Sequence, residues 1–285
     1  MTVKNALDHL ILFLPVDPDT NLPKIPDFIT QNFTLTPGGT HADGLTSNTL
    51  ILLADGCYIE LISFLPTAPP SSISSHWWST FADFPGWADW CLTNDLTPEA
   101  NYASIKDSHA EPKHGGRKRA DGVDVKWAVT FPKGENGGQQ NRGRVPFFCH
   151  DITPRAARVP LSEEATSHPS AVRGVRELSV VVKDQAKLEE TRKVYTALFG
   201  QEGVGQVDAV VFEVGRVEQV DGLDVGSNIV LRVPRDIVEK EKVEERGFLY
   251  RDVVLGAKAG KGKVAGKRDR IDEGDDVRGL WVEYV

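Results

Sequence analysis

A tight turn between two apolar runs, with one carboxylate in the second run, constrains the fold of this chain more than any other feature. Asp55-Gly56 separates residues 46–53 from residues 57–64, and both runs are predominantly apolar. An Asp-Gly pair in this setting predicts a hairpin of two antiparallel strands. Side chains alternate across a strand, so the second strand places Glu60 among the large side chains of one face. Because burial of an unpaired carboxylate is costly, Glu60 needs a partner.

The expected partner of Glu60 lies in the first apolar run, residues 7–14, which is nearly continuous, as in a strand covered on both faces. Alternation places His9 on one face of this strand. Residues 23–33 carry apolar side chains at helical spacing, so residues 7–64 follow a β-α-β-β-β order. A His and a Glu on two strands of such a unit are expected to face each other across a curved sheet, where both are ordinary ligands of divalent metals.

The same order of elements repeats in residues 86–152. A strand is predicted at the start of this segment. Thr97-Pro98 is a typical helix N-terminus, with a capping side chain followed by proline at the first helical position. Further strands follow, and the last of them reaches the end of the segment. Residues 1–152 are therefore expected to contain two paired modules, 7–64 and 86–152.

A polar linker, residues 153–174, separates this pair of modules from the C-terminal region. Residues 175–285 contain a looser set of strand and helix patterns, which we interpret as a third, divergent module of the same kind. The chain is thus predicted to be an α+β protein in which repeated βαβββ modules form a curved half-barrel sheet around a concave site.

Five stretches of the N-terminal region read LDHLILFLP, GGTHADGLTSNTLILL, DGCYIELISF, GRKRADGVDVKWAVTFP and PFFCHD. With these stretches, residues 7–152 resemble the glyoxalase-like family of the vicinal oxygen chelate superfamily. In that superfamily, paired βαβββ modules curl into a half-barrel whose concave face holds a divalent metal or another ligand. The resemblance implies that His9 and Glu60 occupy the two metal positions of the first module. It implies no single reaction, because the family has none in common.

The resemblance extends the candidate site to the second module, since sites of this superfamily draw ligands from both modules. His150 lies roughly where the second module repeats the position of Glu60, so it is the third candidate metal ligand. Asp89 falls near the corresponding place of His9 and is a further candidate for contact with the metal or the substrate. A strand end hydrogen-bonded to the linker is the alternative interpretation of His150.

Three further side chains are candidates for catalysis or substrate binding. His41 follows two glycines in a loop expected at the mouth of the cavity, where it is either a catalytic residue or only a turn residue. Asn48 is expected either to orient a substrate carbonyl or a ligand histidine, or to make a cross-strand hydrogen bond. Arg119 ends a short basic run that is either a clamp for a substrate carboxylate or a solvated turn.

Composition narrows the classes of function. The net charge of -8 excludes a general nucleic-acid surface. The longest apolar run, 10–14, is too short to cross a bilayer and lacks the features of a signal peptide. Cys57, Cys91 and Cys149 each lie in an apolar run, as expected of reduced, buried thiols in a cytoplasmic protein. The expected partner is a small-molecule substrate, and the chain is expected to be a monomer or a homodimer.

Three functions remain open. The first is a metal-dependent lyase or isomerase acting on a small carbonyl-containing metabolite, in which Zn, Ni, Mn or Fe polarises the carbonyl while Glu60 moves a proton. The second is a non-haem iron dioxygenase, because His9, His150 and Glu60 would supply two histidines and one carboxylate. The third is a metal-free protein that binds or sequesters a small molecule in the same cavity.

Overall fold

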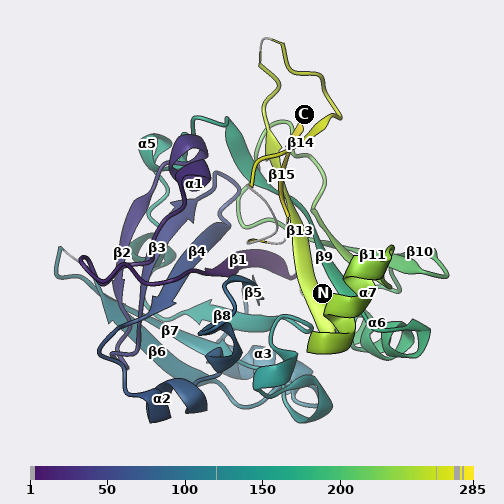
Figure 1. The fold of residues 1–285 in the computed structure, drawn as a ribbon, viewed down its shortest axis with the longest axis horizontal. Coiled ribbons are helices and arrows are strands. Elements are labelled where there is room, and N and C mark those ends of the chain that lie inside the picture. Colours follow the sequence, from purple (N-terminus) through teal and green to yellow (C-terminus); the bar gives the residue numbers. More distant parts are fainter. Residues whose placement is uncertain (1–3, 120, 261, 273–276, 278) are drawn as a thin grey trace.

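Two curved sheets make up the chain, and the computed structural model describes residues 4–119, 121–260, 262–272, 277 and 279–285 (Figure 1). The strands of the first sheet are β1 (Ala6–Phe13), β2 (Thr36–Thr40), β3 (Thr46–Leu52), β4 (Tyr58–Phe64), β5 (Gly86–Thr93), β6 (Lys113–Lys118), β7 (Asp124–Thr130) and β8 (Phe147–Asp151). Those of the second sheet are β9 (Val172–Val182), β10 (Val204–Gln206), β11 (Ala209–Val214), β12 (Ser227–Arg232), β13 (Phe248–Ala257), β14 (Arg268–Arg270) and β15 (Leu280–Tyr284).

Short helices connect the strands of the first sheet, and two longer helices accompany the second. The α-helices are α1 (Asp27–Asn32), α2 (Pro70–Ser75), α3 (Pro98–Ile105), α4 (Arg155–Arg158), α5 (Glu163–Thr166), α6 (Gln185–Phe199) and α7 (Ile237–Arg246). Single 3₁₀ turns are η1 (Ser79–Phe81), η2 (Gly134–Asn136) and η3 (Gln139–Asn141). The predicted helix start at Thr97 is confirmed, since its side chain accepts a hydrogen bond from the Ala100 amide at 3.2 Å. No helix of the described residues is long and apolar enough to span a membrane.

The first sheet has the strand order β2-β3-β4-β1-β5-β8-β7-β6, so the two central strands, β1 and β5, come from the two halves of the repeat. β1 pairs in parallel with β4 and antiparallel with β5, and β5 pairs in parallel with β8. The hairpin predicted at Asp55-Gly56 is present, because β3 and β4 pair antiparallel on either side of it. The predicted α+β fold of repeated modules around a concave site is confirmed.

The first sheet curls until its two edge strands meet. His41, directly after β2, forms a bridge with Arg117 of β6, and the Ala42 amide donates to the Gly116 carbonyl at 3.0 Å. The sheet is thereby nearly closed into a barrel. A closed sheet has few free edges, and its inward-facing residues surround an interior of limited width. This interior holds the candidate site.

The second sheet repeats the order of the first with one strand fewer. Its order is β10-β11-β12-β9-β13-β15-β14, and β9 pairs in parallel with β12 and antiparallel with β13, as β1 does with β4 and β5. Strands thus lie on both sides of the β9–β13 pair, as they do on both sides of β1–β5. A single divergent module was predicted for this region. Buried apolar side chains of both sheets, with Trp87 and Trp90 of β5, form the largest core cluster.

Asp55 of the β3–β4 hairpin also joins the two sheets. Its Oδ2 accepts hydrogen bonds from Arg216 Nη1 and from the Val175 amide, both at 2.9 Å, and its Oδ1 accepts one from the Cys57 amide at 3.1 Å. The side chains of Asp55 and Arg216 are each only 2% exposed. The turn that fixes the hairpin therefore also anchors the second sheet.

Replacing Asp55 by Ala is expected to destabilise the protein strongly, because it leaves the buried Arg216 guanidinium without its counter-ion. Removal of one partner of a buried pair typically costs about 3–5 kcal/mol. Urea unfolding measures this loss. The control is Glu190→Ala, which removes a half-exposed surface pair with Lys187 and is expected to cost below about 1 kcal/mol. Equal losses for the two variants would contradict the role of Asp55.

Candidate functional site

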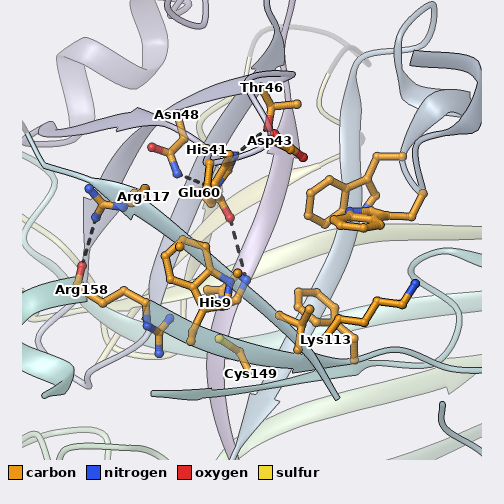
Figure 2. Close-up of a pocket in the computed structure, with 18 of the residues that line it drawn as sticks. His9, His41, Asp43, Thr46, Asn48, Glu60, Lys113, Arg117, Cys149 and Arg158 are labelled. Atoms are coloured by element: carbon orange, nitrogen blue, oxygen red, sulfur yellow. Dashed lines mark hydrogen bonds and ion pairs between the residues drawn. The ribbon is translucent and has the colours of Figure 1, made fainter. Parts of the chain in front are cut away.

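A cavity of about 200 Å³ lies inside the barrel of the first sheet (Figure 2). Aromatic side chains cover much of its wall: Tyr58, Trp77, Trp78, Trp127, Phe131 and Phe147. Many ionisable side chains also line it: His9, His41, Asp43, Glu60, His76, Lys113, His114, Arg117, Cys149 and Arg158. The volume is below the roughly 300–1,000 Å³ of sites for drug-sized ligands, so it suits a small metabolite.

Glu60 lies at the centre of this group of side chains and is only 5% exposed. One carboxylate oxygen, Oε1, accepts a hydrogen bond from Asn48 Nδ2 at 2.6 Å and lies 3.3 Å from His41 Nε2. The other oxygen, Oε2, lies 3.9 Å from His9 Nε2. Burial raises the pKa of Glu60, but hydrogen bonding and the positive charge of His41, then the charge of His9, outweigh it and lower the pKa to about 2. Glu60 is therefore ionised at neutral pH.

Each imidazole facing Glu60 is held from behind through its other nitrogen. His9 Nδ1 lies 2.6 Å from Asp8 Oδ1, and His41 Nδ1 lies 2.7 Å from Thr46 Oγ1. The ring of His9 also stacks on Tyr58, with centroids 4.7 Å apart. Both Nε2 atoms are consequently directed toward the same carboxylate. This is the arrangement in which protein histidines usually bind metals, with the second ring nitrogen fixed by another side chain.

Asp8, behind His9, is fully buried and belongs to a network of charged side chains. Arg158 donates to both of its oxygens, at 2.8 and 2.9 Å, and Arg155 donates to Oδ2 at 2.5 Å. Burial alone would raise the pKa of Asp8, but the two arginines hold it well below its ordinary value. Asp8 is thus a fixed negative charge that orients His9.

A close backbone approach positions Asn48. The Gly39 amide donates to Asn48 Oδ1 at 3.0 Å, which leaves the amide nitrogen of the side chain for Glu60. A Cβ atom on Gly38 would lie only 2.0 Å from Asn48 Oδ1, so a larger residue there would displace the side chain. The glycine pair before His41 therefore serves the site directly.

Four of the side chains predicted for the site, His9, His41, Asn48 and Glu60, line this one cavity. His150 does not, because alternation along β8 turns its neighbours Phe147 and Cys149 inward. His150 Nε2 instead lies 3.2 Å from Asn94 Oδ1 in a separate pocket.

The other two predicted residues also lie outside the cavity. Asp89 is buried behind Trp78, and the indole nitrogen of Trp78 donates a hydrogen bond to it at 3.2 Å. Asp89 also lies 3.6 Å from the Arg142 guanidinium. Arg119 follows the end of β6 and donates to Asp121 at 2.8 Å and to the Ala157 carbonyl at 3.1 Å.

Several lining residues escaped the prediction. Arg117, two positions before Arg119, lines the cavity. It belongs to the same basic run that led to the prediction of Arg119. Tyr58 shares the predicted face of Glu60, so alternation alone points to it. Asp8 carried no signal beyond its place next to His9, because its partners follow about 150 residues later in α4.

Two groups of donor atoms are candidates for a metal site. Donor atoms of Asp8, His9 and Cys91 lie within 4.8 Å of one another, but the Asp8 oxygens already accept from two arginines. Among the described residues, no arginine or lysine pairs with Glu60 or with the facing nitrogen of His9, and their separation of 3.9 Å is bridgeable by one ion at ordinary ligand distances of about 2.0–2.2 Å. The second group fits a divalent metal better.

Comparison with known proteins gives the family and the fold. Residues 7–199 match the family model described as glyoxalase-like domain, and no curated protein sequence matches the chain. A solved structure of a hypothetical protein from Staphylococcus aureus is similar over 99% of this chain and 100% of its own, with a TM-score of 0.67 and 12% identity. A mutant of 4-hydroxymandelate synthase from Streptomyces coelicolor is similar over 90% of this chain and 72% of its own, with a TM-score of 0.50 and 13% identity.

At such low identity the two structures show the shared fold alone. The family match is more specific, because it covers more than half of the chain and begins within β1, just before the histidine that faces Glu60. The barrel of paired modules and its concave cavity agree with this match. The chain belongs to the glyoxalase-like domain family.

Proposed function

We propose that the protein is a metal-dependent lyase or isomerase that moves a proton on a small carbonyl-containing metabolite. The observation that carries the proposal is the ionised, buried Glu60, which faces two imidazoles whose outer nitrogens are already held. A buried ion pair of this kind is rarely more stabilising than apolar side chains of similar volume, so stability alone does not account for it. Binding of a cation and a substrate would account for the buried, ionised Glu60.

In this proposal His9 and Glu60 hold the metal. When bound, a divalent metal supplies Lewis-acid polarisation of a substrate carbonyl. Asp8 keeps His9 in the tautomer whose Nε2 is free to bind, as a carboxylate behind a metal ligand usually does. A carboxylate with a pKa of about 2 is a weak base, so Glu60 suits the role of ligand better than that of proton acceptor.

His41 is then the side chain that carries the proton. Its side chain is 17% exposed, against 6% for His9, and it lies where β2 and β6 close the barrel. A neutral hydroxyl, Thr46, rather than a carboxylate, holds its outer nitrogen. An imidazole is the side chain best suited to accept and return a proton near neutral pH. The aromatic wall limits access of water to the substrate.

A non-haem iron dioxygenase is the second candidate function, and one observation favours it. His41 Nε2 lies 3.3 Å from Glu60 Oε1, so His9, His41 and Glu60 offer the two histidines and one carboxylate that such enzymes use for Fe(II). Their three donor atoms do not all lie within 4.8 Å of one another, so the side chains would have to move closer together around the ion. The two functions therefore differ in the role of His41, which is a proton carrier in the first and a metal ligand in the second.

Metal binding tests the proposal. We expect Glu60→Gln to weaken binding of Zn²⁺ or Mn²⁺ to the chelator-treated protein by more than about 100-fold, since loss of an outer partner alone costs about 10–100-fold. His41→Gln retains the metal if the protein is a lyase or isomerase and loses it if His41 is a ligand. Isothermal titration calorimetry measures both. His150→Gln is the control, because His150 lies outside the cavity. Unchanged affinity in Glu60→Gln would overturn the proposal.

The ionisation of Glu60 also predicts how the stability of the metal-free protein depends on pH. Because its pKa in the folded protein, about 2, is below the ordinary 4.5, ionised Glu60 stabilises the fold above pH 4.5, and this stabilisation is lost as the pH falls toward 2. The shift corresponds to about 3 kcal/mol. The difference in unfolding free energy between the wild type and Glu60→Gln should therefore decrease by about this amount over that interval. A constant difference would contradict the assigned ionisation.

A further inference from the structure

We propose that Arg117 binds the carboxylate of the substrate, and that this substrate is a small organic acid with a planar, aromatic or conjugated body. The inference rests on the proposed function in that it concerns the same cavity, but its test requires neither metal nor turnover. Arg117 would bind the substrate carboxylate at one end of the cavity, and His9, His41 and Glu60 would act on the rest of the substrate.

Arg117 is a buried cation without an acidic partner. The residue is 7% exposed, and its guanidinium donates to two backbone carbonyls, those of Gly38 at 3.1 Å and Arg158 at 3.4 Å. Among the residues that the structure describes, no carboxylate lies within ion-pair distance of it, and the negative charge of Glu60 acts on it only from farther away. Two contacts leave most of its five N–H donors without a protein acceptor. A guanidinium in this state is prepared for a planar anion, which it binds in two parallel hydrogen bonds.

The neighbouring Arg158 shows the contrast. It also lines the cavity, but its guanidinium donates to both oxygens of Asp8 and to both oxygens of Asp151, and also to the Tyr58 hydroxyl. Its charge is therefore already neutralised within the protein. Of these two buried arginines, only Arg117 has its charge available for a ligand. The backbone bridge between Arg117 and His41 holds its Cα at the seam of the barrel.

The cavity wall defines the rest of the substrate. Trp77, Trp127, Phe131 and Phe147 present aromatic surface to the cavity. Flat aromatic side chains pack most favourably on a flat, unsaturated partner. The volume of about 200 Å³ admits only a small acid of this kind.

The position of Arg117 also orients such a substrate. In Figure 2 Arg117 lies beside Asn48, next to Glu60 and away from Lys113. Glu60 repels a carboxylate on either side of it, but on the side of Arg117 the guanidinium attracts the carboxylate and offsets this repulsion. The substrate is thus expected to bind with its carboxylate at Arg117, which leaves its adjacent carbon atoms toward the side of the cavity that holds His9 and His41.

Calorimetric titration of the metal-free protein with benzoate and with benzamide tests the inference. The two probes have nearly the same shape, but only benzoate carries a charge. We expect benzoate to bind at least about tenfold more tightly, since hydrogen bonds to a charged group contribute at least that much. Arg117→Met is expected to abolish the preference. Lys118→Met is the matched control, because it removes the same charge from the exposed face of β6.

Equal affinity of the wild type for the two probes would overturn the inference. This comparison needs no variant, so the inference stays testable even if circular dichroism shows that Arg117→Met does not fold. Retained preference in a folded Arg117→Met protein would overturn it too, and so would tighter binding of inorganic phosphate than of benzoate. Glu60→Gln is expected to bind benzoate at least as tightly as the wild type, because it removes a nearby negative charge. Failure of metal binding would therefore leave this result unaffected.

Discussion

The buried ion pairs of Asp8 are the interaction on which the cavity depends. Asp8 lies on the central strand β1, and its two arginine partners come from α4, directly after the last strand of the barrel. These bonds attach the linker to the first strand and fix the ring of His9. Buried ion pairs of this kind contribute little net stability, but removal of one partner is very costly. We infer that the network is retained because it sets the orientation of His9.

Carboxylate and imidazole side chains alternate across the cavity from this fixed point. The negative Asp8 holds His9, His9 faces the negative Glu60, and Glu60 in turn contacts His41. Each group compensates the burial of the next, which makes a carboxylate in an aromatic cavity tolerable. Arg117 stands outside this alternation and has no acidic partner among the described residues. This imbalance is the reason to assign substrate recognition to it.

Alternation and turn chemistry were sufficient to predict the first half of the site. The hairpin signal fixed the register of β4, and His9 and Glu60 then had to share a face. The prediction for the second module was wrong because it depended on the same alternation, counted from the wrong residue. Matching His150 to Glu60 across the repeat was off by one position in β8, and a shift of one residue turns a side chain to the opposite face.

Long-range contacts and irregularities of the strands could not be predicted from the sequence. The register of β5 against β1 shifts beside Asp89, so alternation could not show that this carboxylate packs behind Trp78. β6 ends at Lys118, and Arg119 therefore leaves the sheet while Arg117 stays inside. The partners of Asp8 lie so far along the chain that no local pattern connects them.

We propose that His9 and Glu60 form the metal site of this protein. Anomalous scattering from crystals grown with Mn²⁺ or Zn²⁺ tests it most directly, because it locates the ion independently of any substrate. We expect one strong peak between His9 Nε2 and the Glu60 carboxylate. A peak within the group of Asp8, His9 and Cys91, or no peak beside Glu60 when the protein is saturated with metal, would contradict it.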